Sequence, residues 1–392
     1  MVTRPLEGVR IADFTWVGVG PFATKFLADF GADVIKVEST INVDVVRKGQ
    51  PFANGKPGLN RSGYFANRNT SKRGITLNLK HPGGLAIAKD LIRLSDVVIN
   101  NFSPGVMAKF GLDYDTVCKF NTEIIYVDMP MQGMSGPHAR FRGYGAMINA
   151  LSGLYASTGL EGRRPVGTGT NYPDHVPNPL HGAIAIVAAI TACKLGAGGR
   201  YIEISQLESA TSVLGPYLMQ ALNGSTPDRM LGNGHPVGEP QWILPCRDGK
   251  WCVITIRNER QWESFFTLLK LAGPKRATSA VQETLACWLR GQTAERAMRT
   301  LQDAAIPAGW VKDASDMLGD PQLAHSGHWV RLDHPQMGKT VHDAPVARLS
   351  KTPARLSAPA PMLGQHTREV MMGLLKLDTT EFEKLRAQGV FN

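Results

Sequence analysis

Asp174 is the residue of this chain whose type and position most directly suggest chemistry. It lies where a Gly- and Pro-rich loop meets a predicted apolar helix, and Pro177 follows near a first-turn position of that helix. A carboxylate before a helix start meets unpaired N–H groups and the positive end of the helix dipole. Such a site keeps an aspartate ionised and favours negative charge that develops beside it. An aspartate is also among the best helix N-caps, so a structural cap is the default interpretation of Asp174.

The stretch from Pro165 to Glu208 must position this carboxylate. It predicts a loop, an Ala- and Ile-rich helix, a tight glycine turn and a strand over residues 200–205. Near the N-terminus, GVRIADFTWVG predicts a buried strand that ends in the loop Gly18–Gly20. A helix then runs to Gly31, and ADVIKVE predicts the next strand. This unit is Rossmann-like, although GVGPFA matches the GxGxxG fingerprint only in part.

Strands continue to alternate with helices further along the chain. DVVIN and IIYVDM predict two more strands, and RGYGAMINALSGL predicts a helix. The alternation favours an α/β fold in which a parallel sheet has helices on both faces. A Gly- and Pro-rich break follows, and then a hairpin around Asp248 and Gly249. We therefore predict a large domain from residues 1–222, a small α+β domain from 223–325, and a return segment from 326–392 that completes the large domain.

Composition narrows the classes of function. The 392 residues are 43% hydrophobic and 19% charged, which is ordinary for a globular protein, and no apolar run is expected to be long enough to span a bilayer. Without a signal-peptide pattern, the protein is expected in the cytoplasm. The five cysteines are scattered without CxxC spacing, so neither a metal site nor a disulfide framework is indicated. The net charge of +10 comes from dispersed residues, which favours a phosphate-bearing small molecule over nucleic acid or a membrane.

The order of several motifs resembles a known family. The chain contains GVRIADFTWVGVGPFATKFLADFGADVIKVE, SKRGITLNLK, INNFSPGVMAKFG, RGYGAMINALSGL, the Asp174 loop and GGRYIEISQLESA, followed by DGKWCVITIRNERQWESF and PMLGQHT. With this combination the chain resembles, nearly end to end, the family III CoA-transferases. That family includes formyl-CoA transferase, the carnitine CoA-transferases and, more distantly, alpha-methylacyl-CoA racemase.

The resemblance implies a role for Asp174 as the catalytic carboxylate. It would attack a donor acyl-CoA, such as succinyl-CoA, to give an acyl-aspartyl anhydride and CoA thiolate. The thiolate would then form an aspartyl-CoA thioester, from which CoA passes to a carboxylic acid acceptor. The residue types agree with this chemistry, because the exchange needs a nucleophile that is ionised at pH 7 and leaves as easily as it attacks. The glycine-rich loops Gly18–Gly20 and Gly232–Gly238 are candidates to donate N–H groups to the oxyanion, or are plain turns.

Contacts with coenzyme A, the expected co-substrate, are also implied by the resemblance. The basic side chains of Arg47, Lys80, Lys109 and Arg142 would pair with its phosphates, and Phe102 would pack against the rest of the CoA molecule. Any single Lys or Arg can equally be a solvated surface residue. No metal is expected. The residues that match the family's CoA-binding positions are Trp16, Val17, Gly18, Arg47, Leu77, Lys80, Asn101, Phe102, Lys109, Arg142 and Tyr144.

Two departures from formyl-CoA transferase bear on the acceptor. A run of four glycines that closes over that active site is replaced here by GNGHPVGEPQ, and a glutamine of the first loop is replaced by Gly18. His235 and Glu239 lie in the altered loop, where they could contact the acceptor or simply face solvent. The NYPDHVPNP loop looks most like the benzylsuccinate-type branch. An aromatic or branched dicarboxylate is therefore the first expectation for the acceptor.

Two other functions stay open at this stage. A racemase needs a histidine acid/base at the head of the RGYGAMIN helix, where none stands; His138 lies in the preceding loop, and His175 beside Asp174 is a weaker substitute. The chain could also be a non-catalytic subunit of a hetero-oligomer, against which an intact Asp174 speaks. The family fold implies an interlaced homodimer, in which each ring-shaped chain is threaded by the other, so the subunits should not separate without unfolding.

Overall fold

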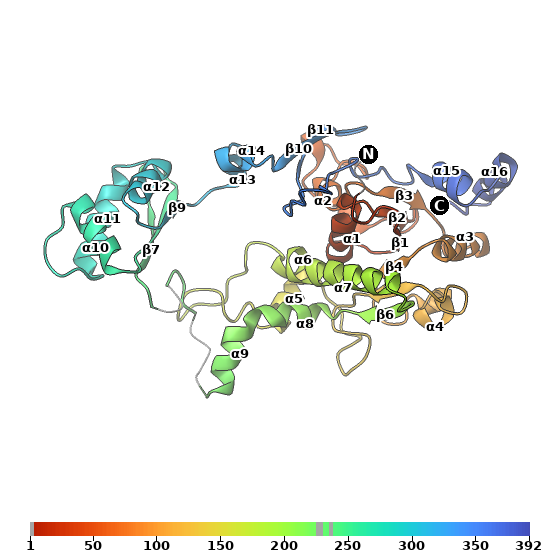
Figure 1. Cartoon of the computed structure of the whole chain (residues 1–392), viewed down its shortest axis with the longest axis horizontal. Coiled ribbons are helices and arrows are strands. Elements are labelled where there is room, and N and C mark those ends of the chain that lie inside the picture. The colour runs from red at the N-terminus through yellow and green to blue at the C-terminus, as the bar shows by residue number, and fades with distance from the viewer. Residues whose placement is uncertain (1–3, 225–229, 235–237) are drawn as a thin grey trace. The chain divides into compact units, whose positions relative to one another are not determined.

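The computed structural model describes residues 4–224, 230–234 and 238–392, and the chain forms two compact units (Figure 1). The first unit comprises Met1–Leu154, Gly169–Met219 and Gly327–Asn392, and the second comprises Tyr155–Thr168 and Gln220–Ser326. The chain returns to the first unit after residue 326. Residues 155–168 lie in the second unit, whereas the prediction placed them in the large domain.

A six-stranded parallel sheet forms the centre of the first unit, as the alternating pattern predicted. Its strand order is β3-β2-β1-β4-β5-β6, so the order reverses between β1 and β4. Ile11 of β1 pairs with Val34 of β2 on one side and with Val97 of β4 on the other. The strands are β1 (Arg10–Asp13), β2 (Asp33–Glu38), β3 (Arg73–Thr76), β4 (Val97–Asn100), β5 (Ile125–Asp128) and β6 (Arg200–Glu203).

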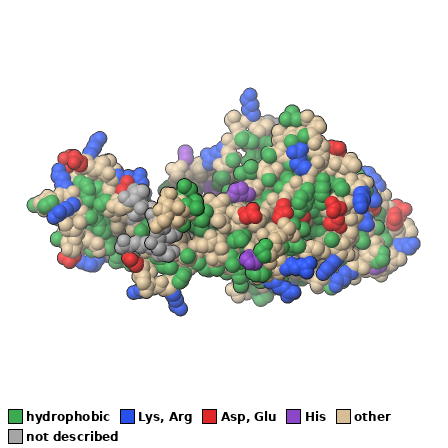
Figure 2. All heavy atoms as spheres, turned by 90° about the horizontal axis from the view of Figure 1, so that it is seen from below, with side chains coloured by type: hydrophobic (Ala, Val, Ile, Leu, Met, Phe, Trp, Pro, Cys, Tyr) green, Lys and Arg blue, Asp and Glu red, His purple; other side chains and the backbone are tan. Residues whose placement is uncertain are grey.

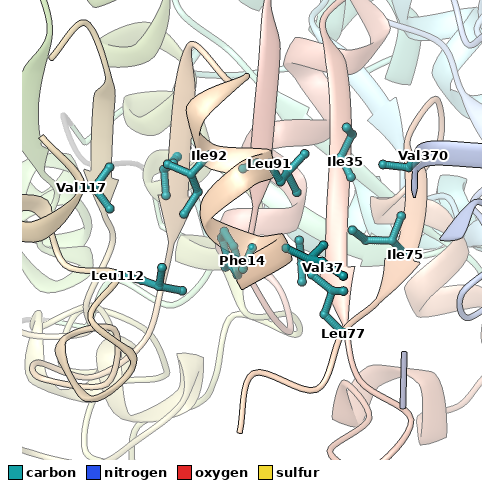
Figure 3. Close-up of a cluster of buried hydrophobic side chains, with 14 of the residues drawn as sticks. Phe14, Ile35, Val37, Ile75, Leu77, Leu91, Ile92, Leu112, Val117 and Val370 are labelled. Atoms are coloured by element: carbon teal, nitrogen blue, oxygen red, sulfur yellow. The ribbon is translucent and has the colours of Figure 1, made fainter. Parts of the chain in front are cut away.

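Apolar side chains fill both faces of this sheet. On one face, Ala23 of α1 and Ile186 of α7 pack with Val34 and Val97. On the other, Leu91 of α3 packs with residues of the neighbouring strands and loops (Figure 3). The helices of the first unit are α1 (Val19–Asp29), α2 (Gly63–Arg68), α3 (Pro82–Arg93), α4 (Tyr114–Val117), α5 (Gly145–Leu151), α6 (Tyr172–His175), α7 (Pro177–Lys194), α8 (Gln206–Thr211), α15 (Thr367–Glu369) and α16 (Thr379–Ala387), with α9 (Gly215–Leu222) crossing its boundary.

The second unit has its own core and its own antiparallel sheet. Strand β8 pairs with both β7 and β9, and Gly249 has a φ of 75° in the turn that joins β7 to β8, as the Asp-Gly signal predicted. Trp242, Phe265 and Leu285 belong to the core beneath the sheet. The elements are β7 (Gln241–Pro245), β8 (Trp251–Thr255), β9 (Ala308–Trp310), α10 (Glu259–Leu269), α11 (Ser279–Arg290), α12 (Ala294–Asp303), α13 (Ala314–Leu318) and α14 (Pro321–His325).

The return segment contains strands and helices. An antiparallel hairpin is formed by β10 (Trp329–His334) and β11 (Gly338–Asp343). A helix begins at Thr367 and changes to a π-helix over Val370–Leu374, and α16 follows it. The side chain of Asp378 caps α16 by accepting from the N–H of Glu381.

One helical stretch corrects an expectation drawn from composition. Residues Tyr172–Lys194, which include α6 and α7, are long and apolar enough to cross a membrane by length and composition. The prediction that no run reaches this length was therefore wrong, because the small Ala and Gly residues interleaved with Ile and Val keep the whole stretch apolar. In the structure this stretch packs on α1, and Ile186, Ala189 and Ile190 are buried there.

Candidate active site

Asp174 lines a cavity of about 580 Å³ in the first unit, which we call the larger cavity. Many of the residues predicted for the site meet there, although they come from distant parts of the chain. The cavity is also lined by Met131, Asn171 and Gln206, for which no role was predicted. The predicted residues that line it are Asp174, Trp16, Val17, Gly18, Asn101, Phe102, Arg142 and Tyr144.

A second cavity of about 460 Å³, the smaller cavity, adjoins the first. The two share Trp16, Val45 and Phe102 in their linings. The smaller cavity contains two further predicted residues, Leu77 and Lys80, together with Lys48, which was not predicted. The smaller cavity therefore places two cations, Lys48 and Lys80, and several apolar side chains beyond the shared residues as seen from Asp174.

Both cavities lie where the strand order of the sheet reverses. Ligands of open α/β sheets bind at such a point, outside the carboxyl ends of the strands. Here the loop after β1 and the loop after β4 are joined: the N–H of Trp16 donates to Oδ1 of Asn101 at 2.8 Å, and Nδ2 of Asn101 donates to the carbonyl of Trp16 at 2.8 Å. The rings of Trp16 and Phe102 also meet edge to face, 5.9 Å apart. These contacts fix the two loops as one wall.

The loop after β1 contains a strained residue. Val17 has a φ of 66°, a conformation that is rare for a β-branched side chain. The buried carboxylate of Asp44 accepts the N–H of Val17 at 3.2 Å, and Lys36 lies 3.6 Å from the same carboxylate. Lys36 also donates to the carbonyl of Thr15 at 2.6 Å. The loop is therefore held in this conformation by buried charged groups.

The structure corrects the local setting that we predicted for Asp174. The residue lies within the one-turn helix α6, whose N-cap is Asn171, and Val176 precedes α7 without a side-chain cap. Asp174 is therefore not the N-cap of the long helix, although Pro177 is its first residue as predicted. Two glycines face the Asp174 carboxylate: a Cβ on Gly18 would lie 3.5 Å from Oδ2, and one on Gly145 only 2.5 Å from it. Only glycine leaves room at position 145.

Burial changes the acidity of Asp174. Its side chain is 6% exposed, and burial raises its pKa to about 6, with the positive charge of Arg68 acting in the opposite direction. We expected a helix start to keep this aspartate ionised; burial acts against ionisation and outweighs the nearby positive charge, so the pKa rises. With a pKa near 6, the carboxyl group still loses its proton at pH 7 and is a better base than an exposed aspartate.

His175 is directed away from the cavity. Nη2 of Arg68 lies 3.1 Å from Nε2 of His175 and also contacts Nδ1, and the Tyr64 and Phe22 rings lie beside the imidazole. Burial, together with Arg68, lowers the pKa of His175 to about 4, so the ring is neutral at pH 7. His138 stacks on Phe141 in the loop before α5. No histidine of the described residues is among those that line the larger cavity.

Two of the predicted CoA-binding residues lie elsewhere. Arg47 is fully buried, pairs with Glu38 at 2.6 Å, stacks on Phe65, and donates to the backbone carbonyls of Leu59 and Pro361. Its guanidinium is thus occupied within the protein, so the predicted phosphate contact is corrected, and the next residue, Lys48, lines the smaller cavity instead. Lys109 follows β4 in a 3-10 turn and lines neither cavity.

The altered glycine loop belongs to the second unit. His235 lies outside the described residues, as does part of the Gly232–Gly238 stretch. Gly232 has a φ of 56°, and Glu239 accepts from Arg257 at 3.0 Å. The contacts that we expected from this loop to an acceptor stay predictions.

Residues missed by the sequence reasoning include the α2 pair Tyr64 and Arg68. Their signal was weak, because α2 is short and lies in a polar stretch; its one marker is Ser62, an N-cap that accepts from Phe65.

No group of three or more potential metal ligands gathers among the residues that the structure describes. On the face shown in Figure 2, Lys and Arg side chains lie at several separate places with Asp and Glu between them.

Known proteins resemble this chain along nearly its whole length. Residues 6–367 match CoA-transferase family III. Succinyl-CoA:glutarate CoA-transferase of Mus musculus is 32% identical over 99% of this chain and 90% of that protein. The beta subunit of succinyl-CoA–L-malate CoA-transferase of Chloroflexus aurantiacus is 28% identical over 99% of this chain and 98% of that protein.

A solved structure gives the same result for the fold. The crystal structure of a CAIB/BAIF family protein from Brucella suis superimposes with a TM-score of 0.83 at 28% identity, covering 95% of this chain and all of that one. The expected Rossmann-like α/β fold is thus confirmed. From its motifs, its sheet and these relatives, the chain belongs to CoA-transferase family III.

Proposed function

We propose that this enzyme transfers CoA from succinyl-CoA to a dicarboxylic acid, with Asp174 as the covalent nucleophile. Membership of the family and the names of the relatives indicate a CoA-transferase that uses CoA thioesters. The observation that supports the finer proposal is the place of Asp174, a carboxylate in a cavity that seven of the predicted CoA-binding residues help to line. Both relatives described above are named for succinyl-CoA and a dicarboxylate, which supports the choice of donor and acceptor.

The reaction needs four exchanges at one carboxyl group. The Asp174 carboxylate attacks the thioester carbonyl and the C–S bond breaks, so that CoA leaves as a thiolate and a mixed anhydride of succinate and Asp174 remains. The thiolate attacks the aspartyl carbonyl, which releases succinate and leaves an aspartyl-CoA thioester. The acceptor carboxylate attacks this thioester and releases the thiolate again. Finally the thiolate attacks the acceptor's acyl carbon, giving the new acyl-CoA and free Asp174.

The surroundings of Asp174 suit this sequence of steps. No side chain among the described residues caps the start of α1, where Gly18 is the N-cap. The first N–H groups of a helix have no intrahelical partner, so they can donate to an oxyanion formed beside Gly18. The absence of side-chain atoms at Gly18 and Gly145 lets an acyl group approach the carboxylate from either side. One such N–H donor typically contributes about 3–4 kcal/mol to the transition state.

The two cavities together suit an elongated carrier. Lys48 and Lys80 in the smaller cavity would pair with its phosphates, and Trp16 and Phe102 would pack along its arm. The reactive sulfur would then reach the larger cavity, where Asp174 lies. In this arrangement Arg142 and Tyr144 of the larger cavity lie near the acyl end.

The proposal is tested by trapping the intermediate. The protein is incubated with succinyl-CoA, treated with hydroxylamine, and digested for mass spectrometry; we expect a hydroxamate at Asp174. Asp174→Asn should give no modification and no transfer to glutarate. Asp128→Asn is a matched control, since Asp128 is another buried carboxyl whose pKa burial raises but which lies outside the larger cavity. Modification at another residue, or transfer by Asp174→Asn at the unmodified rate, would exclude Asp174 as the nucleophile.

The racemase alternative is less well supported. Two bases must face the substrate's alpha carbon, yet His175 contacts Arg68 and lies outside the lining of the larger cavity. We expect no replacement of the alpha hydrogen by deuterium when a 2-methylacyl-CoA is incubated with the enzyme in heavy water. Exchange that disappears in His175→Asn would restore this alternative.

We propose an interlaced homodimer as the assembly. The exposed side of α7 carries Leu180, Ile184 and Val187, and Ile184 alone is 67% exposed. Apolar surface of this kind usually marks a site of association. Light scattering of the isolated chain should give twice the mass of 42.6 kDa, with transferase activity. An inactive chain that gains activity only with a second protein would identify it instead as a subunit of a hetero-oligomer.

A further inference from the structure

Five Lys or Arg side chains are buried in the described part of the chain, and four of them have a carboxylate partner. The four pairs are Lys25 with Asp29 at 2.8 Å, Lys36 with Asp44 at 3.6 Å, Arg47 with Glu38 at 2.6 Å, and Lys72 with Asp13 at 3.2 Å. Arg68 is the fifth. It is 4% exposed, and within the described residues it makes no ion pair at or below 4 Å.

Arg68 is held by neutral groups. Its guanidinium lies 3.7 Å from the centre of the Tyr64 ring, faces Phe22 at 5.5 Å, and contacts both ring nitrogens of His175. Its Nε is buried without a hydrogen-bond partner in the structure. Burial lowers the pKa of His175 to about 4, so this imidazole accepts from the guanidinium and does not repel it.

An uncompensated buried cation is unfavourable, so its retention calls for a reason. Its charge is not neutralised locally, and in a poorly screened interior it therefore acts on the nearest carboxylates. The positive charge of Arg68 opposes the effect of burial on Asp174. Arg68 does not line the larger cavity, so it acts on the carboxylate through the protein and not on the substrate.

We propose that Arg68 is a positioning residue for Asp174: it fixes the α6 turn through His175 and supplies the positive charge that favours the ionised carboxylate. This inference rests on the proposed role of Asp174. Few other titratable groups lie on the elements around α6. They are Tyr64 on α2, Lys25 with its partner Asp29 on α1, His181 on α7, which contacts Ser209, Cys193 and Lys194 at the far end of α7, and the exposed Glu208 on α8. Asp343 of β11 lies 3.6 Å from Lys25 and also acts on the charge of Arg68.

The first test titrates the carboxyl group without substrate. Infrared difference spectra between the unmodified protein and Asp174→Asn should show the carboxyl band of Asp174 disappearing with a midpoint at a pH of about 6. In Arg68→Gln the midpoint should move up by at least about one pH unit, because loss of an opposite charge raises a carboxyl pKa. Arg68→Lys keeps the charge and should keep the midpoint. Arg10→Gln, which removes a half-buried arginine paired with Asp33, is the matched control and should leave it unchanged.

The second test measures the rate of hydroxamate formation at Asp174 in a single turnover with succinyl-CoA. Arg68→Gln should be at least about threefold slower at a pH near 6.5 and should recover part of its rate at higher pH, because a tenfold change in the ionisation constant moves a midpoint near pH 6 to about pH 7. Arg68→Lys should show a lower rate with an unshifted pH limb, since it loses the contact to His175. A purely structural role would lower the rate in both variants without moving either midpoint.

The outcomes separate this inference from the function on which it rests. An unmoved infrared midpoint in Arg68→Gln would overturn the role of Arg68 while leaving the role of Asp174 intact. Absence of any hydroxamate at Asp174 in the unmodified enzyme would overturn the proposed function, whatever the titration shows. Should Arg68→Gln fail to fold, His175→Leu provides the second variant: it keeps the cation, so the midpoint should stay at or below that of the unmodified protein while the rate falls. A midpoint that rises in His175→Leu would overturn the inference.

Discussion

Replacing Asp174 by asparagine should stabilise the folded protein at neutral pH. The ordinary pKa of an aspartate is 3.8, and burial raises that of Asp174 to about 6. One pKa unit corresponds to about 1.4 kcal/mol, so the ionised carboxylate destabilises the fold by about 3 kcal/mol at pH 7.5. Asparagine has nearly the same shape and no charge, and therefore avoids this cost.

The pH dependence gives the sign. Between about pH 4 and pH 6 the folded protein keeps the proton that the unfolded chain has lost, so the free energy of unfolding falls as pH rises through this window. The free energy of unfolding of Asp174→Asn has no such fall in this window, because asparagine does not ionise. The variant should therefore match the unmodified protein near pH 4 and exceed it by up to about 3 kcal/mol above pH 7.

Chemical denaturation at pH 4.5 and pH 7.5 measures this difference, with the protein concentration held constant because the unfolding of an oligomer depends on it. The exposed Asp115→Asn is the control and should change the free energy of unfolding by less than about 0.5 kcal/mol at either pH. A variant Asp174→Asn that is less stable at pH 7.5, or equally stabilised at both pH values, would refute the reasoning. Either result would mean that Asp174 ionises without a penalty from burial.

Four further substitutions follow from the site. Gly145→Ala places a methyl group 2.5 Å from the carboxylate of Asp174, so hydroxamate formation should fall at least about a hundredfold while calorimetry shows acyl-CoA binding retained. Lys48→Ala should raise the KM for acyl-CoA several-fold in a salt-dependent way without loss of stability, whereas Arg47→Ala should cost about 3–5 kcal/mol of stability because it leaves a buried carboxylate unpaired. Val17→Gly relieves a positive φ, so thermal melting should show no loss of stability, while kcat falls because the loop loses its fixed shape.

The sheet and the place of the site could be predicted from the sequence, because both depend on local patterns. Buried strands that alternate with helices specify a parallel sheet, and the loops after such strands must meet at its carboxyl edge. The loops of Trp16 and Asn101 follow this rule and join directly. Asp174 could be placed near them through its family motif and not through any periodicity.

The charges of the site could not be predicted in the same way. Arg47 and Lys48 are adjacent basic residues, and only the packing of Glu38 and Phe65 decides that the first is buried and the second lines a cavity. The rise in the pKa of Asp174 likewise comes from burial by distant elements. Arg68 lies on a helix of six residues, too short for an amphipathic pattern to reveal which side of it is inside.

The two adjoining cavities have a consequence for divergence within this architecture. Trp16, Val45 and Phe102 lie between the smaller cavity, which contains Lys48 and Lys80, and the larger cavity, which contains Asp174. If the phosphate-bearing end of CoA binds in the smaller cavity and the acyl group in the larger one, substitutions at Met131 or Gln206 can change which acyl group fits. The binding of the phosphate-bearing end would stay the same. The acceptor specificity of such an enzyme could in this way change one substitution at a time, while its binding site for CoA is conserved.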